Sequence, residues 1–229
     1  QTITIFRYTI AVSAWLALAW LVIRLMDIFF WDGLVAPRLG GKVPRLLKDV
    51  LATIIFLIAI TGIIVALLSP IMGAIADRGG YRKLYLILWT WVSIIGALLL
   101  WYPVEGQVKF ALTAFIIGNV GFEMGGVFCN AFLPDIAPKE KIGRVSGYGW
   151  SFGYVGGLIA LLIGLFLFVK PEIPIFNLDK STFEDIRATN IMVAVWFAVF
   201  SIPTFLFVHQ ERKPRASKGR LIRDSINQI

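Results

Sequence analysis

The segment Gly73-Ala-Ile-Ala-Asp77-Arg78-Gly-Gly80-Tyr-Arg82-Lys83 lies where two uncharged stretches, 50–76 and 84–104, meet. It concentrates glycines, one carboxylate and three cations in a short polar turn, here named turn 73–83. Two further uncharged stretches follow at 145–169 and 188–208. Each stretch is at least as long as the roughly 20 apolar residues that cross a bilayer core. The pattern therefore predicts an all-α, polytopic membrane protein.

Hydrophobic residues make up 58% of the 229 residues, whereas soluble domains contain about 45–50%. Helix-breaking Gly and Pro residues separate the apolar blocks. We predict about six transmembrane helices of the length that a bilayer requires, at 8–31, 47–76, 82–103, 107–132, 145–169 and 187–208.

Lysine and arginine are concentrated in alternate loops. Turn 73–83, the loop after 132 and the tail 209–229 are basic. The loop between the third and fourth helices has only Lys109, and in the loop between the fifth and sixth helices four acids outnumber Lys170, Lys180 and Arg187. Cytoplasmic loops carry an excess of Lys and Arg, so we expect turn 73–83 and the tail in the cytoplasm. The tail is either a short interfacial helix or a disordered basic terminus.

Composition argues against several other classes. The only cysteine, Cys129, and the only histidine, His209, are far from any cluster of metal-binding or catalytic side chains. We therefore expect no metal, no cofactor and no enzymatic activity. The net charge of +8 reflects cytoplasmic loops rather than a nucleic-acid surface.

The spacing G-x-x-x-D-R-x-G-x-R-K of turn 73–83 resembles the signature loop between the second and third helices of major facilitator superfamily transporters. Within that superfamily, Ser69–Gly80, Ala131–Ala137, Ile142–Gly157 and Val195–Phe207 resemble the vacuolar-effluxer-like branch, which includes the autophagy-related amino acid exporter. The resemblance covers residues 66–229. It implies five of the six helices of one N-terminal half.

In this superfamily the signature loop acts as a latch that holds one conformation. The resemblance implies that Asp77 and Arg78 are its charged parts and that Arg82 and Lys83 anchor it in the cytoplasm. Gly73 and Gly80 are expected to let the backbone turn tightly and approach its neighbours closely, because glycine has no Cβ. A tight basic turn without any latch function explains the same residues.

Two further groups of residues could serve transport. Gly149, Gly153 and Gly157 recur every four residues, so they form a smooth helix face for close packing, either static or sliding. The second group, Asn119, Glu123 and Asn130, lies within about 40° on one helix face. A carboxylate at this depth costs about 2.5 kcal/mol or more. The stripe therefore either lines a water-filled cavity, where Glu123 carries a proton or binds a cationic group, or contains a protonated Glu bonded to another helix.

The N-terminal residues differ from this pattern. Alternation places the loop between the first two helices outside, yet it carries Arg38, Lys42, Arg45 and Lys48. The sequence around it resembles the membrane helices of small-conductance mechanosensitive channels. We therefore divide the chain into a hairpin at 1–65, transporter-like helices at 66–208 and a tail at 209–229.

The leading hypothesis is an incomplete half of a secondary transporter in a bacterial inner membrane. Its partners would be lipid, a small solute such as an amino acid, protons, and a second six-helix half or partner chain. The rival hypotheses are a mechanosensitive-channel-like protein and a non-transporting membrane subunit.

Overall fold

The computed structural model describes residues 45–209 apart from 173 and 174, together with isolated positions between 10 and 28. All regular secondary structure in these residues is helical, which confirms the predicted all-α class. Five segments are long and apolar enough to cross a membrane: Lys48–Asp77, Arg82–Leu99, Val108–Ile136, Lys139–Val169 and Glu184–Phe207. Arg38, Lys42, nearly all of the tail and most of the predicted helix at 8–31 lie outside the described residues.

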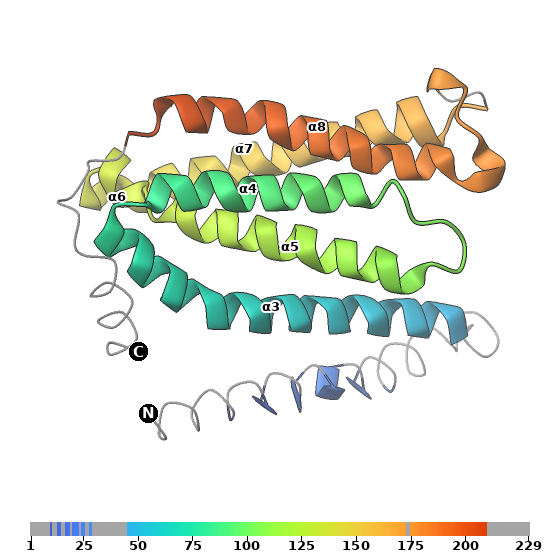
Figure 1. The fold of residues 1–229 in the computed structure, drawn as a ribbon, viewed down its shortest axis with the longest axis horizontal. Coiled ribbons are helices and arrows are strands. Elements are labelled where there is room, and N and C mark those ends of the chain that lie inside the picture. The colour runs from blue at the N-terminus through green and yellow to red at the C-terminus, as the bar shows by residue number, and fades with distance from the viewer. Residues whose placement is uncertain are drawn as a thin grey trace. The chain divides into compact units, whose positions relative to one another are not determined.

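The chain forms two compact units, Gln1–Leu68 with Ile229, and Ser69–Gln228. Helix α3 (Arg45–Gly79) is one continuous helix of 35 residues that runs from the first unit into the second (Figure 1). Its 35 residues are more than the roughly 20 that cross a bilayer core. The boundary that we predict near residue 65 lies inside this helix, and the functional division there remains a prediction.

In the second unit, α4 (Arg82–Leu99) and α5 (Val108–Asn130) run side by side in opposite directions (Figure 1). Small residues allow their backbones to approach closely. A Cβ added to Gly96 would clash with the backbone of Gly118, and one added to Gly121 would lie 2.5 Å from the nitrogen of Ser93. Such contacts between small residues are a principal source of helix association in membranes.

Aromatic packing and one internal hydrogen bond complete this interface. The rings of Tyr85 and Phe128 stack with centroids 5.3 Å apart. The buried hydroxyl of Thr90 donates to the Leu86 carbonyl at 2.8 Å, so its burial leaves no donor unsatisfied. α4 and α5 therefore form a tightly fitted pair.

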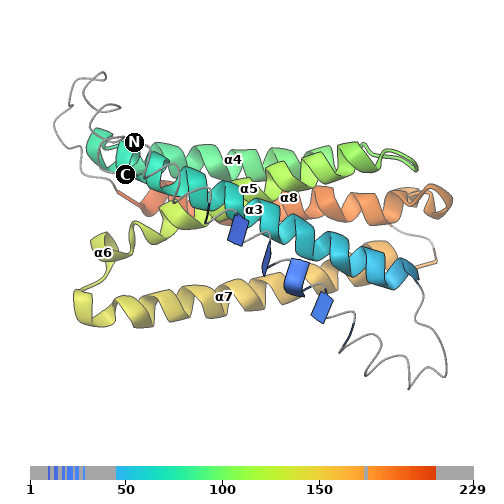
Figure 2. The same cartoon turned by 90° about the horizontal axis from the view of Figure 1, so that it is seen from below.

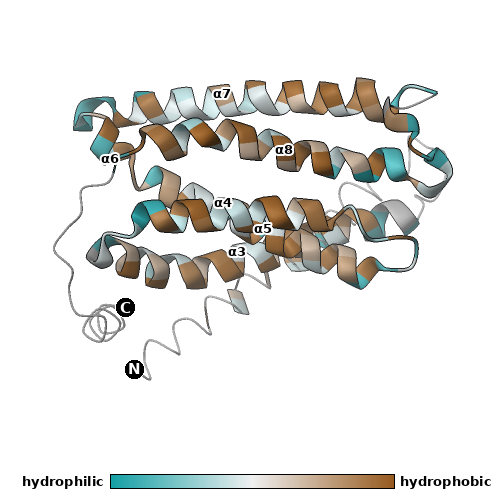
Figure 3. Cartoon of the chain, turned by 45° about the horizontal axis from the view of Figure 1, so that its top comes forward, coloured by the Kyte–Doolittle hydropathy of each residue, from teal (hydrophilic) through white to brown (hydrophobic). Residues whose placement is uncertain are grey.

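A short helix, α6 (Leu133–Ile136), and a 3₁₀ turn (Lys139–Lys141) connect α5 to α7 (Ile142–Ile163). α7 continues as a π-helical segment, η3 (Gly164–Val169). α8 (Glu184–Phe207) packs against α4 and against η3, where a Cβ on Gly164 would lie 3.3 Å from Met192. α7 and α8 lie next to each other in Figure 3, and Figure 2 shows α7 well away from α4.

The membrane-spanning helices bury few of their side chains within the described part of the chain. Large apolar residues such as Leu84, Trp91, Phe152 and Val195 are more than half exposed. Figure 3 shows hydrophobic residues along α7 and α8 and hydrophilic ones at the ends of the helices. This distribution suits a protein whose solvent is lipid, since lipid tails cover apolar surface at no cost.

Candidate functional site

Turn 73–83 is a helix end that requires glycine at one position. α3 ends at Gly79, and Gly80 follows with φ 65°. The N–H of Tyr81 bonds to the Ala76 carbonyl at 2.9 Å, which is the six-residue bond of a Schellman cap. Glycine is favoured in this left-handed position because it has no Cβ. The prediction that Gly80 allows a tight turn is confirmed.

Gly73 does not take part in that turn. It lies inside α3, and a Cβ placed on it would meet no described atom within 4 Å. Our prediction that Gly73 lets the backbone turn was wrong, because the helix continues for six residues beyond it. Arg78 lies in the last turn of α3, but its side chain is outside the described residues. Lys83 is the second residue of α4 and is half-buried.

Arg82 is the centre of the site. Its Nη2 lies 3.0 Å from Oδ2 of Asp135, and its Nε lies 3.5 Å from Oδ1 of Asp77. Its Nη1 donates to the Ala131 carbonyl at 2.9 Å, and its Cζ lies 5.3 Å from the centre of the Phe132 ring. We call these five residues the Arg82 cluster. The cluster joins the end of α3, the start of α4 and the end of α5.

The guanidinium is well suited to this position. Its planar fork provides several donors at fixed angles, so it can bind two carboxylates and a carbonyl at the same time. The Arg82 side chain is only 20% exposed, whereas those of Asp135 and Asp77 are 42% and 66% exposed. We therefore expect the contact with Asp135, which is shorter and better shielded, to be the stronger of the two ion pairs.

Sequence reasoning did not assign a role to Asp135 or to the Ala131 carbonyl. Asp135 lies 53 positions after Arg82 in the sequence, so no local spacing connects them. One signal was available: Asp135 is an acid in a loop that carries more bases than acids, namely Lys139, Lys141 and Arg144 against Asp135 and Glu140. Such an acid is a candidate partner for a base in the neighbouring loop.

The polar stripe of α5 faces away from the helices that pack on it. Glu123 and Asn130 are exposed and Asn119 is half-buried, whereas Met124 and Phe128 are fully buried, Phe128 against Tyr85 of α4. Within the second unit, no described side chain bonds to Glu123. The hypothesis of a protonated Glu bonded to a neighbouring helix therefore finds no partner among these residues. A carboxylate facing lipid at this depth is costly.

The predicted packing face of α7 has no described partner in this unit. A Cβ on Gly149, Gly153 or Gly157 would meet nothing described within 4 Å. Close helix packing instead uses Gly96, Gly118 and Gly121, which we did not single out. The signal for these was present, because small residues recur at three-residue and four-residue spacing in both α4 and α5.

A model of the family described as "Vacuole effluxer Atg22 like" matches residues 43–229. The chain is 27% identical to the uncharacterized MFS-type transporter YxiO of Bacillus subtilis (strain 168), over 68% of this chain and 36% of that protein. It is 21% identical to autophagy-related protein 22-1 of Penicillium rubens, over 62% of this chain and 33% of that protein. The chain thus spans about a third of the length of these relatives. No solved structure matches it.

Proposed function

Because the chain belongs to the Atg22-like vacuole effluxer family, we propose that it is part of a secondary transporter that moves a small solute by alternating access. The observation that carries this proposal is the Arg82 cluster, in which one guanidinium connects three helix ends. Such a cluster can be made and broken as helices move, which is what a conformational latch requires.

The strength of the cluster suits that role. A hydrogen bond involving a charged group contributes about 1.5–3 kcal/mol, and an exposed ion pair contributes about 0–1 kcal/mol. A two-state transition typically separates conformers by a few kcal/mol. The cluster can therefore favour one conformer without preventing the other from forming.

We propose that the polar stripe of α5 lines the transport pathway. Glu123 is exposed in the middle of an apolar helix, so water or another polar surface must cover it in the membrane. As a carboxylate it would accept a coupling proton or hold a cationic substrate group. Amino acids are the substrate class that the family resemblance implies.

The pathway needs further elements, because transporters of this type bind substrate between two repeats. We propose that a second six-helix half, or a partner chain, supplies the opposite wall. The open glycine face of α7 is one surface that it could contact closely. We further propose that the protein lies in a plasma membrane. Turn 73–83, which is rich in Lys and Arg, then faces the cytoplasm.

Uptake into proteoliposomes tests the proposal, with the complete gene product and a panel of labelled amino acids. We expect saturable uptake that depends on a proton gradient and is lost in Glu123→Gln. Lys109→Gln removes a charge from an exposed residue at the start of the same helix. It serves as the matched control, and we expect the variant protein to transport normally. Conductance gated by membrane tension would instead support a channel, and the absence of both activities would support a structural subunit.

A further inference from the structure

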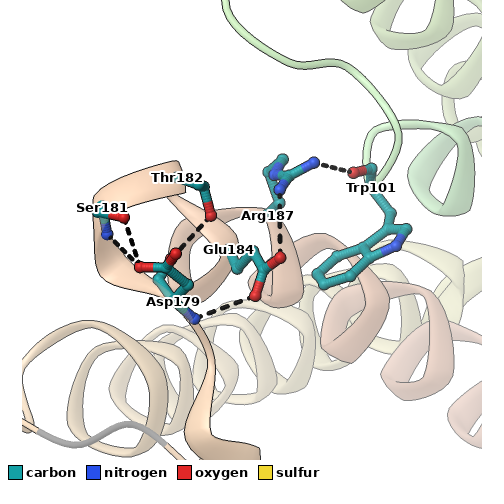
Figure 4. A network of polar contacts seen from close by, with 6 residues as sticks. All are labelled: Trp101, Asp179, Ser181, Thr182, Glu184 and Arg187. Atoms are coloured by element: carbon teal, nitrogen blue, oxygen red, sulfur yellow. Dashed lines mark hydrogen bonds and ion pairs between the residues drawn. The ribbon is translucent and has the colours of Figure 1, made fainter.

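A second polar cluster lies at the opposite end of α4 from Arg82, and Figure 4 shows its side chains. It involves residues just beyond the C-terminus of α4 and the residues around the start of α8. We call it the Arg187 clasp, and its members are Trp101, Asp179, Ser181, Glu184 and Arg187.

Arg187 is the residue that connects the two helices. Its Nη1 donates to the Trp101 carbonyl at 3.1 Å, and its Cζ lies 5.2 Å from the centre of the Trp101 ring. The Arg187 side chain is only 17% exposed. The Trp101 carbonyl lies just beyond the C-terminus of α4, close to the negative end of the helix dipole, so a cation there is favourable.

The segment before α8 is ordered by its own hydrogen bonds. Oε2 of Glu184 accepts from the Asp179 N–H at 3.0 Å, and Oε1 of Glu184 lies 3.9 Å from Arg187. Oδ1 of Asp179 accepts from the N–H and the hydroxyl of Ser181, at 2.8 and 2.7 Å. These bonds fix the Glu184 carboxylate in place beside Arg187.

The same arrangement occurs at both ends of α4. Arg82, in the first turn of α4, donates to the carbonyl after the end of α5 and lies over Phe132. Arg187, in the first turn of α8, donates to a carbonyl after the end of α4 and lies over Trp101. Each arginine lies in the first turn of one helix and binds the C-terminal end of a neighbouring antiparallel helix. α4 is held to α5 at one end and to α8 at the other.

We propose that the Arg187 clasp is a conformational device that keeps α4 and α8 together as one rigid pair while the Arg82 cluster opens and closes. It extends the tightly packed α4–α5 pair into a body of three helices. Within the described residues α7 stands outside that body: it continues into η3, which packs against α8 and whose Val169 carbonyl accepts a hydrogen bond from Lys180 Nζ at 2.8 Å. The opening of the Arg82 cluster rests on the proposed function, whereas the pairing of α4 with α8 does not.

Hydrogen–deuterium exchange of the full-length protein in nanodiscs tests the clasp. Arg187→Met keeps an apolar chain of similar length and removes the guanidinium group. We expect faster exchange in peptides covering 97–107 and 179–192, with unchanged exchange in peptides covering 76–90 and 128–137 at the opposite end of α4. Lys109→Met removes one positive charge from the start of α5, at the same end of the bundle, and should change neither set. Unchanged exchange at 97–107, or an equal rise at both ends, would overturn the proposal.

Two additional variants test the clasp even if Arg187→Met does not fold. Arg187→Lys keeps the charge but loses the planar fork, and it should show the same selective rise; unchanged exchange at 97–107 would count against the clasp. In a Cys129→Ser background, cysteines placed at 101 and 187 can be joined by a short bifunctional maleimide. Joining them should restore slow exchange and leave any transport intact. The double-cysteine protein is assayed for transport before and after crosslinking. If it transports before but not after, α4 and α8 must separate during transport, which would contradict a rigid pair.

Discussion

A Cβ atom added to Gly121 of α5 would lie 2.5 Å from the backbone nitrogen of Ser93 in α4. Real Cβ atoms essentially never come so close to a neighbouring atom, so the two helices would have to move apart. The fit between α4 and α5 therefore depends on the absence of a single methyl group.

We predict that Gly121→Ala lowers the stability of the protein by about 1–3 kcal/mol, the usual cost of overpacking. Gly126 lies on the same helix, and a Cβ added to it would meet no described atom within 4 Å, so Gly126→Ala is the matched control. It should stabilise by up to about 1 kcal/mol because alanine loses less backbone freedom. Thermal unfolding in detergent compares the two, and equal effects would contradict the packing described here.

Gly80 provides a second backbone prediction. Its φ of 65° is a conformation that costs an L-residue other than glycine about 1–2 kcal/mol. We expect Gly80→Ala to destabilise by about this amount and Gly80→Asn by less, since asparagine visits this region more readily. Thermal unfolding measures both, and identical losses would mean that the left-handed backbone is not the cause.

The Arg82 cluster can be tested by a double-mutant cycle. Arg82→Met should cost about 1.5–3 kcal/mol, the usual value of charge-assisted hydrogen bonds, since it leaves the Ala131 carbonyl and Asp135 without their donor. Asp77→Asn should cost less than Asp135→Asn, because Asp77 is more exposed and its contact is longer. Unfolding measurements on the single and double variants give the coupling energy. A larger coupling for Asp77 than for Asp135 would contradict the geometry.

Glu123→Gln should separate stability from function. The neutral amide avoids the cost of placing a carboxylate in the membrane, about 2.5 kcal/mol or more at a helix centre, so we expect unfolding temperature to stay the same or rise. Proton-coupled transport by the full-length protein should be lost. A variant that is destabilised and still transports would indicate a structural role for this residue.

Asp179 makes the segment before α8 sensitive to acid. The hydrogen bonds from the Ser181 side chain and backbone lower the pKa of Asp179 below its ordinary value of 3.8. A lowered pKa in the folded state means that the stabilisation is complete well above 3.8 and is lost as the pH falls through the lowered value. We expect the segment 179–184 to open at acid pH. Comparison of its hydrogen exchange with that of Asp179→Asn checks this, because the variant should lack the acid transition.

Much of the fold could be predicted from local sequence. The uncharged stretches predicted the positions of α4, α5, α7 and α8 to within a few residues. This works because a bilayer sets both the length and the polarity of a helix that crosses it. The turn at Gly80 could also be predicted locally, because glycine favours the left-handed backbone that ends a helix. α4 ends earlier than the predicted 103, at Leu99, since exposed apolar residues such as Tyr102 extend the hydrophobic pattern beyond the helix.

The candidate site was harder to predict, because its contacts join residues far apart in the chain. Asp135 and Ala131 reach Arg82 only when α5 returns alongside α4, and Trp101 reaches Arg187 only when α8 does so. The glycines of α7 and those at the α4–α5 interface have similar spacing, so periodicity alone could not show which set packs against a helix.

The sequence alone determined that this protein is an all-α membrane protein, where its helices lie to within a few residues, and that Glu123 is an isolated carboxylate within one of them. Those properties depend on the length, polarity and backbone preferences of short segments. The tertiary structure decided which small residues bring helices together, and that Arg82 and Arg187 fasten α4 at its two ends. Contacts of this kind depend on distances between helices, which the order of residues along one helix does not specify.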